Sequence, residues 1–225
     1  EQAYRESLAH RERLLGEFPG EPEYLHNLAT SYNNLGLLLK LTGRFQDAQK
    51  ALSEGLELKK HATAKAAAKP EHRFGLAMAY MNLGTVLNEF GRLKEAEEAG
   101  VQARAVMQKL VDEFPRPMYR KWLAGCHNNL AILFWQTGRV EEAEKSYGQA
   151  RAAAEKLAAD YPTVPDYHRS LAGQYSNFAV LLRTSGRARE AQELNEKALQ
   201  LRKQLTGEFA ARPAYRQDLG DSYRN

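Results

Sequence analysis

Few residues of this sequence are spaced for catalysis. Cys126 and His127 are adjacent, and neighbours on a helix point about 100° apart, which does not suit a nucleophile and its base. The six histidines show no metal-ligand spacing such as His-Glu-x-x-His, and the sequence has no glycine-rich phosphate loop. The acidic pairs Glu97-Glu98 and Glu141-Glu142 lie near expected helix starts, where acids suit the helix dipole. We therefore expect no enzyme, no metal site and no cofactor.

A recurring asparagine is better suited to binding. Asn34, Asn82, Asn129 and Asn177 each precede a glycine by nine positions. A carboxamide offers a donor and an acceptor, which suits the N–H and C=O groups of an extended peptide without selecting its side chains. The alternative, equally open, is that each asparagine bonds the backbone of the neighbouring repeat and fixes the stacking.

The asparagines belong to a unit that occurs four times. Its glycines Gly43, Gly91, Gly138 and Gly186 follow one another at steps of 48, 47 and 48 residues. A period of this size indicates a solenoid of repeated helical units. Proline recurs in step with the unit at 22, 70, 117, 165 and 213, and it suits the first position of a helix. Each glycine is expected to end the helix that such a proline begins.

Small residues also recur, two positions after each asparagine, as Gly36, Gly84, Ala131 and Ala179. They are expected where the two helices of a hairpin approach closely, facing Ala48 and its equivalents. A large side chain there would overpack the hairpin.

Composition and charge exclude several classes of protein. The chain has 225 residues, of which 43% are hydrophobic, and no apolar run approaches the roughly 18 residues of a membrane span. The 32 basic and 28 acidic residues are interspersed. The most basic stretch, Lys59 to Lys69, lies on an alanine-rich helix where lysine is expected to be a solvated helix former. We expect no membrane and no nucleic-acid partner, and a cytoplasmic segment of a longer chain.

The first two copies carry an aromatic residue two positions before the asparagine, then Leu-Gly, a further large apolar residue and later an alanine. This pattern resembles the tetratricopeptide repeat. In the first copy these residues are Tyr32, Leu35, Gly36, Leu39 and Ala48. In the second they are Tyr80, Leu83, Gly84, Leu87 and Ala96. The unit is about 14 residues longer than the standard repeat, and with its doubled Asn-Asn-Leu it looks like kinesin-light-chain-type repeats. It is also similar to arrays in bacterial signalling proteins.

The resemblance implies an all-α fold, a right-handed α-solenoid of stacked antiparallel helical hairpins that forms a single domain over 1–225. Its expected parts are the second helix of a preceding repeat at 1–20, repeats at 21–69, 70–116, 117–164 and 165–212, and the start of a fifth repeat at 213–225.

In tetratricopeptide arrays the first helices line a concave groove, and the resemblance implies that this chain binds there. The expected peptide-binding residues are Asn33, Asn34, Lys40, Met81, Asn82, Asn88, Asn128, Asn129, Trp135, Asn177 and Arg183. The predicted function is a non-enzymatic scaffold that binds an extended internal peptide of a partner protein. A clamp for a terminal carboxylate fits poorly, because the two basic residues among these, Lys40 and Arg183, lie three repeats apart. The alternative is a structural, regulatory or self-associating segment of a larger signalling protein such as a bacterial serine/threonine kinase.

Overall fold

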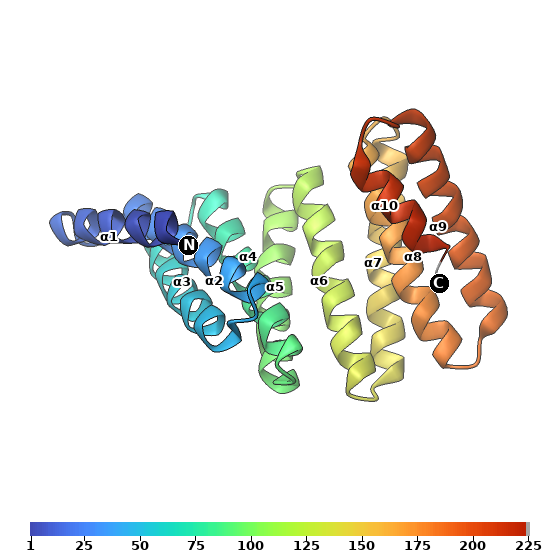
Figure 1. Ribbon diagram of the computed structural model, residues 1–225, viewed down its shortest axis with the longest axis horizontal. Helices are drawn as coiled ribbons and strands as arrows, with labels where there is room; N and C mark the ends of the chain where they lie inside the picture. The colour runs from blue at the N-terminus through green and yellow to red at the C-terminus, as the bar shows by residue number, and fades with distance from the viewer. Residues whose placement is uncertain (224–225) are drawn as a thin grey trace. The chain divides into compact units, whose positions relative to one another are not determined.

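Every regular element in residues 1–223, which the computed structural model describes, is an α-helix (Figure 1). The helices are α1 (Gln2–Glu17), α2 (Pro22–Leu41), α3 (Phe45–Lys65), α4 (Pro70–Glu89), α5 (Leu93–Glu113), α6 (Pro117–Gln136), α7 (Val140–Asp160), α8 (Pro165–Thr184), α9 (Ala188–Glu208) and α10 (Pro213–Ser222). Helices that follow one another pack as antiparallel hairpins, α2 with α3, α4 with α5, α6 with α7 and α8 with α9. The predicted all-α solenoid class is confirmed.

The chain forms two compact units, which we describe separately. The first, Glu1–Pro115, contains α1 to α5, and the second, Arg116–Asn225, contains α6 to α10. In the first unit α2 also packs against α4, and in the second α6 packs against α8, whereas α3 with α5 and α7 with α9 make no comparable contact in the described residues. Within each unit the first helices of successive hairpins therefore pack closer to one another than the second helices do. One continuous domain over 1–225 stays a prediction.

Proline and glycine set the helix boundaries as the sequence predicts. Pro22 is the first residue of α2, and Glu21 before it is extended, with φ −67° and ψ 117°. Gly43 has φ +74°, and its N–H donates to the Lys40 carbonyl at 3.0 Å while the Arg44 N–H donates to the Leu39 carbonyl at 2.9 Å. This pair of bonds is a Schellman motif, which a residue in the left-handed region completes. The same turn occurs at the other three repeat glycines.

Close approach within the first hairpin is confirmed. A Cβ on Gly36 would lie 2.6 Å from Leu52 Cγ and 3.2 Å from the Ala48 carbonyl oxygen, and Ala48 itself has no exposed surface. The hairpin therefore brings α2 and α3 together at these small residues. A Cβ on Gly84 would meet its nearest atom, the Ala96 carbonyl oxygen, at 3.3 Å, so the second hairpin is less tightly closed.

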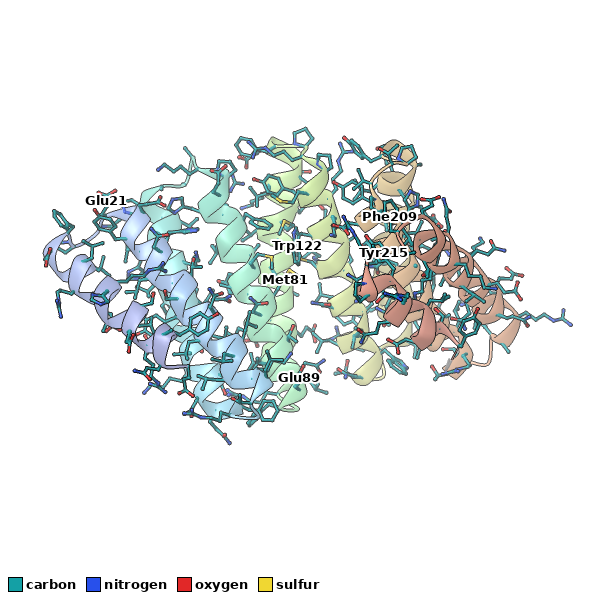
Figure 2. The ribbon with its side chains drawn as sticks, turned by 45° about the horizontal axis from the view of Figure 1, so that its top comes forward. Glu21, Met81, Glu89, Trp122, Phe209 and Tyr215 are labelled. Carbon is teal, nitrogen blue, oxygen red and sulfur yellow. The ribbon has the colours of Figure 1, made fainter. Side chains whose placement is uncertain are left out.

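Aromatic pairs join the end of a second helix to the first helix that follows it at three junctions, where Phe18, Tyr161 and Phe209 pack against Tyr24, Tyr167 and Tyr215. Phe18 packs edge-on against Tyr24 with ring centroids 5.7 Å apart, and Phe209 packs in the same way against Tyr215 at 6.0 Å (Figure 2). At the junction between α3 and α4 the corresponding residues are Ala66 and His72. The alanine-rich helix α3 ends at Lys65 and not, as the sequence suggests, near Lys69.

Candidate binding face

Two of the predicted binding residues of the first unit meet where α2 contacts α4, a line that we call the α2–α4 seam. Asn82 Nδ2 donates to Asn33 Oδ1 at 2.8 Å, and both side chains are partly buried. Asn34, the next residue on α2, is exposed. Met81 is half-buried beside Asn82 on α4. An asparagine of one repeat is thus hydrogen-bonded to an asparagine of the next.

The second unit repeats this contact between α6 and α8. Asn177 Nδ2 donates to Asn128 Oδ1, again at 2.8 Å. Asn128 Nδ2 in turn lies 3.5 Å from the oxygen of Asn129, which is half-buried. The equivalent bond in two separate units shows that the asparagine pattern produces a defined contact between first helices.

These bonds show how two of the four recurring asparagines, Asn82 and Asn177, take part in stacking. The partner is a side chain of the neighbouring repeat and not its backbone, as the stacking alternative supposed. The carboxamide groups are not saturated by this contact. In the first unit the Asn82 oxygen and the Asn33 NH2 group have no hydrogen bond within residues 1–223. One acceptor on Asn82 and one donor on Asn33 therefore remain on these two half-buried residues.

The charge on this face is neutralised in the first unit. Lys40 Nζ forms an ion pair with Glu89 at 2.7 Å across the α2–α4 seam, with Glu89 near the end of α4 in Figure 2. Only the pairing of the two helices reveals this contact, because the residues are 49 positions apart in the sequence. Lys40 is thus held by an acid of its own chain, which makes it a poor anchor for a ligand carboxylate.

The other predicted residues lie near the ends of their helices and make no shared cluster in the described structure. Asn88 on α4 keeps a buried carboxamide oxygen without a hydrogen-bond partner. Trp135, near the end of α6, is half-buried, and Arg183, near the end of α8, is exposed. Their part in binding stays a prediction.

Replacing Asn82 by alanine is expected to lower the free energy of unfolding by about 1 kcal/mol, because it leaves the Asn33 oxygen without its donor. Urea unfolding followed by circular dichroism measures this change. Asn34→Ala is the matched control, and as an exposed site it should change stability by less than about 0.5 kcal/mol. Equal effects of the two substitutions would contradict a stacking role for the bond.

One basic residue differs from the sequence prediction. Lys59 was expected to be solvated, but it is only 4% exposed. Its Nζ donates to the His26 carbonyl at 3.0 Å and to Thr30 Oγ1 at 2.9 Å. The residues at the same position of the next two repeats, Met107 and Ala154, are buried and apolar. The same position carries Arg11 one repeat earlier and Arg202 in the last repeat, so comparison of the repeats alone does not indicate that Lys59 is buried.

Cys126 is buried in α6. Between residues 1 and 223, no three His, Cys, Asp or Glu side chains are grouped to hold a metal ion. None of the described helices is long and apolar enough to span a membrane.

Comparison with known proteins identifies the repeat. A family model described as Tetratricopeptide repeat matches residues 28–62, 76–115, 123–159 and 171–209, more than half of the chain. The crystal structure of BtubC (BKLC) from P. vanneervenii is 22% identical over 99% of this chain and 81% of that one, with a TM-score of 0.69.

Two further solved structures share the fold. A putative kinesin light chain from Podosopora anserina with nearly identical TPR-like repeats is 20% identical over 89% of this chain and 88% of that one, with a TM-score of 0.57. MamA is 17% identical over 91% of each chain, with a TM-score of 0.54. No curated protein matches the sequence.

Proposed function

Because this chain belongs to the tetratricopeptide repeat family, whose members are generally non-enzymatic protein–protein interaction scaffolds, we propose that it binds an extended peptide segment of a partner protein. The binding surface is the face of the first helices, α2 with α4 in one unit and α6 with α8 in the other. The observation that carries the proposal is the Asn33–Asn82 pair with its remaining donor and acceptor.

The chemistry of this pair suits a peptide backbone. An extended chain presents its N–H and C=O groups alternately, and a carboxamide can satisfy either group whatever the side chain of the ligand. The exposed Asn34 adds a second carboxamide within one residue of the pair. Binding through main-chain groups therefore requires an extended backbone in the ligand, and it depends little on the exact sequence of the ligand.

The type of peptide follows from the charges and the apolar residues of the face. Lys40 is paired with Glu89, so the first unit has no strong site there for a terminal carboxylate. The half-buried Leu37 and Met81 provide apolar surface on the same two helices. This combination favours an internal peptide segment with uncharged and apolar side chains over an acidic chain terminus.

A peptide selection followed by a binding measurement tests the proposal. Peptides selected on the wild-type chain from a displayed random library are titrated against the double variant Asn34→Ala, Asn129→Ala. Neither residue makes the 2.8 Å stacking bond, so the fold should remain. The expected result is roughly fivefold weaker binding at each unit, since one hydrogen bond contributes about 1 kcal/mol.

The matched control removes two exposed carboxamides from second helices, Gln46→Ala on α3 and Gln149→Ala on α7, and should bind as the wild type does. Equal binding by the two double variants would reject the first-helix face as the peptide site. If no peptide is selected and sedimentation shows a mass that rises with concentration, self-association replaces peptide binding as the function.

A further inference from the structure

Three basic side chains are packed together on the α2–α4 seam. We call His26 on α2, Lys59 on α3 and His72 on α4 the basic cluster. The two imidazole rings are in edge-to-face contact with centroids 4.8 Å apart, and the Lys59 ammonium donates to the carbonyl oxygen of His26 itself. A Cβ on Gly75 of α4 would lie 3.0 Å from His26 Cε1 and 3.2 Å from Lys59 Nζ. The α4 backbone is therefore closely packed over His26 and Lys59.

The cluster occupies the position where three other junctions have an aromatic pair. His72 occupies the position of Tyr24, and no aromatic residue from the end of α3 reaches it because Ala66 stands there. His26 and Lys59 occupy positions that carry Phe74 and Met107 one repeat later. The junction between α2–α3 and α4 is thus built from titratable groups where the neighbouring repeat has apolar ones.

Little negative charge lies close to the basic cluster to offset its positive charge. Glu23 on α2 has its Oε2 3.7 Å from His72 Nε2, and its side chain is 55% exposed. Neither hydrogen bond of Lys59 goes to a carboxylate. The remaining charged groups that act on the cluster are Lys69 and Glu71 at the start of α4, which have opposite signs.

Burial therefore dominates the protonation of all three groups. It lowers the pKa of His26 to about 4, with the Lys59 charge adding to the effect, and it lowers the pKa of Lys59 to about 8. Burial also lowers the pKa of His72, which the nearby Glu23 offsets in part. At neutral pH both imidazoles are uncharged and Lys59 carries the only positive charge of the three.

We propose that the basic cluster makes the α2–α4 seam an acid-sensitive joint, which is closed while the imidazoles are neutral and opens when they take up protons. A proton on His26 places a second positive charge beside the Lys59 ammonium, whose side chain is buried, and His26 Nδ1 is itself a buried atom without a hydrogen-bond partner in the described residues. The nearest acid, Glu23, is too exposed to compensate. Opening the seam returns the imidazolium groups to water.

The direction of the pH dependence follows from proton binding. An imidazole in the opened seam has its ordinary pKa near 6.5, whereas His26 in the closed seam has a pKa of about 4. The opened form therefore binds more protons, and the closed form is lost as the pH falls from about 6.5 toward 4. With these two pKa values the open fraction at pH 5 would rise about 30-fold over that at pH 8. His26 is partly solvated, so we expect roughly tenfold.

The joint also bears on the binding face. Asn33 and Asn82 form their bond along the same seam, so its opening separates the two carboxamides. Acid would then weaken peptide binding, a consequence that rests on the proposed function. Opening of the seam itself is measured without any ligand, so it can be rejected or supported independently of peptide binding.

Hydrogen exchange read by mass spectrometry on the full chain at pH 8 and pH 5, corrected for intrinsic exchange, tests the proposal. Amides of α2 and α4 should open roughly tenfold more often at pH 5, while those where α6 meets α8 provide the internal reference. Unchanged opening of the α2–α4 seam between the two pH values would overturn the proposal.

Variants identify the groups responsible. The pair His26→Phe, His72→Tyr introduces the aromatic residues found at the equivalent positions 74 and 24, and it should abolish the acid response. His61→Gln, at an exposed histidine of α3, should leave the response unchanged. Lys59→Met keeps both histidines and should reduce the response, because His26 loses its charged neighbour. An acid response that persists undiminished in both the double variant and Lys59→Met would also overturn the proposal.

Discussion

Replacing Gly36 by valine is expected to lower the free energy of unfolding by about 3 kcal/mol, the upper part of the range for overpacked cores. The first Cβ alone would lie 2.6 Å from Leu52 Cγ and 3.2 Å from the Ala48 carbonyl oxygen. Leu52 is itself 1% exposed and has little room to move, and the carbonyl belongs to the backbone of α3. The hairpin of α2 and α3 must therefore separate to accept the larger residue. Urea unfolding followed by circular dichroism measures the loss.

Two other glycines provide matched controls for this substitution. Gly148 lies in the middle of α7, and a Cβ there would meet nothing within 4 Å. Gly148→Ala should therefore raise the free energy of unfolding by about 0.5–1 kcal/mol, since alanine is the better helix former. Gly84→Ala should cost less than about 1 kcal/mol, because its repeat equivalents Ala131 and Ala179 already carry a methyl group. A Gly36→Val variant as stable as the wild type would contradict the close approach.

Replacing Lys59 by methionine is expected to raise the free energy of unfolding by about 2 kcal/mol at pH 7, because a buried charge without a carboxylate partner is costly. The side chain is 4% exposed, and methionine fills this position in the next repeat as Met107. The loss of its hydrogen bonds is small, because Thr30 Oγ1 still donates to the His26 carbonyl at 2.9 Å. Lys60→Met, one residue along and paired with Glu57 on the surface, is the control and should not stabilise the protein.

The stabilisation by Lys59→Met should depend on pH in a defined direction. Burial lowers the pKa of Lys59 from 10.5 to about 8, so between these values the unfolded chain binds more protons than the folded one. The wild type therefore gains stability as the pH rises from about 8 toward 10.5, and the advantage of the variant shrinks over the same range. Unfolding curves for both proteins at pH 7 and pH 9.5 measure this. An advantage that is constant or grows with pH would contradict a buried ammonium.

The local structure could be read from the repeat because it depends on residues close together in the chain. Proline at position 22 and glycine at 43 act on their own backbone dihedrals, so they indicate the ends of α2 without reference to the rest of the fold. The spacing of the apolar residues then determines which face of each helix is buried. For these reasons the all-α class and the helix boundaries were predictable, and only the end of α3 was placed too late.

The binding face was predictable only as a set of candidates. The sequence places Asn33 and Asn82 on first helices, but not the 2.8 Å bond between them, since that bond depends on how α2 and α4 pack. The same packing pairs Lys40, a predicted binding residue, with Glu89 of the next repeat. Contacts between residues 49 positions apart have no local signature in the chain.

By itself the sequence determined the repeat, the helical hairpins and the turns, because period, proline and glycine act through short-range geometry. The tertiary structure decided which polar groups are buried and which groups they meet. Lys59 shows the difference: helix propensity is the same for a buried and a solvated lysine, and only the packing of α2, α3 and α4 around it excludes water and lowers its pKa. The desolvation of a side chain depends on how several helices pack around it, so the sequence of a single helix does not predict it.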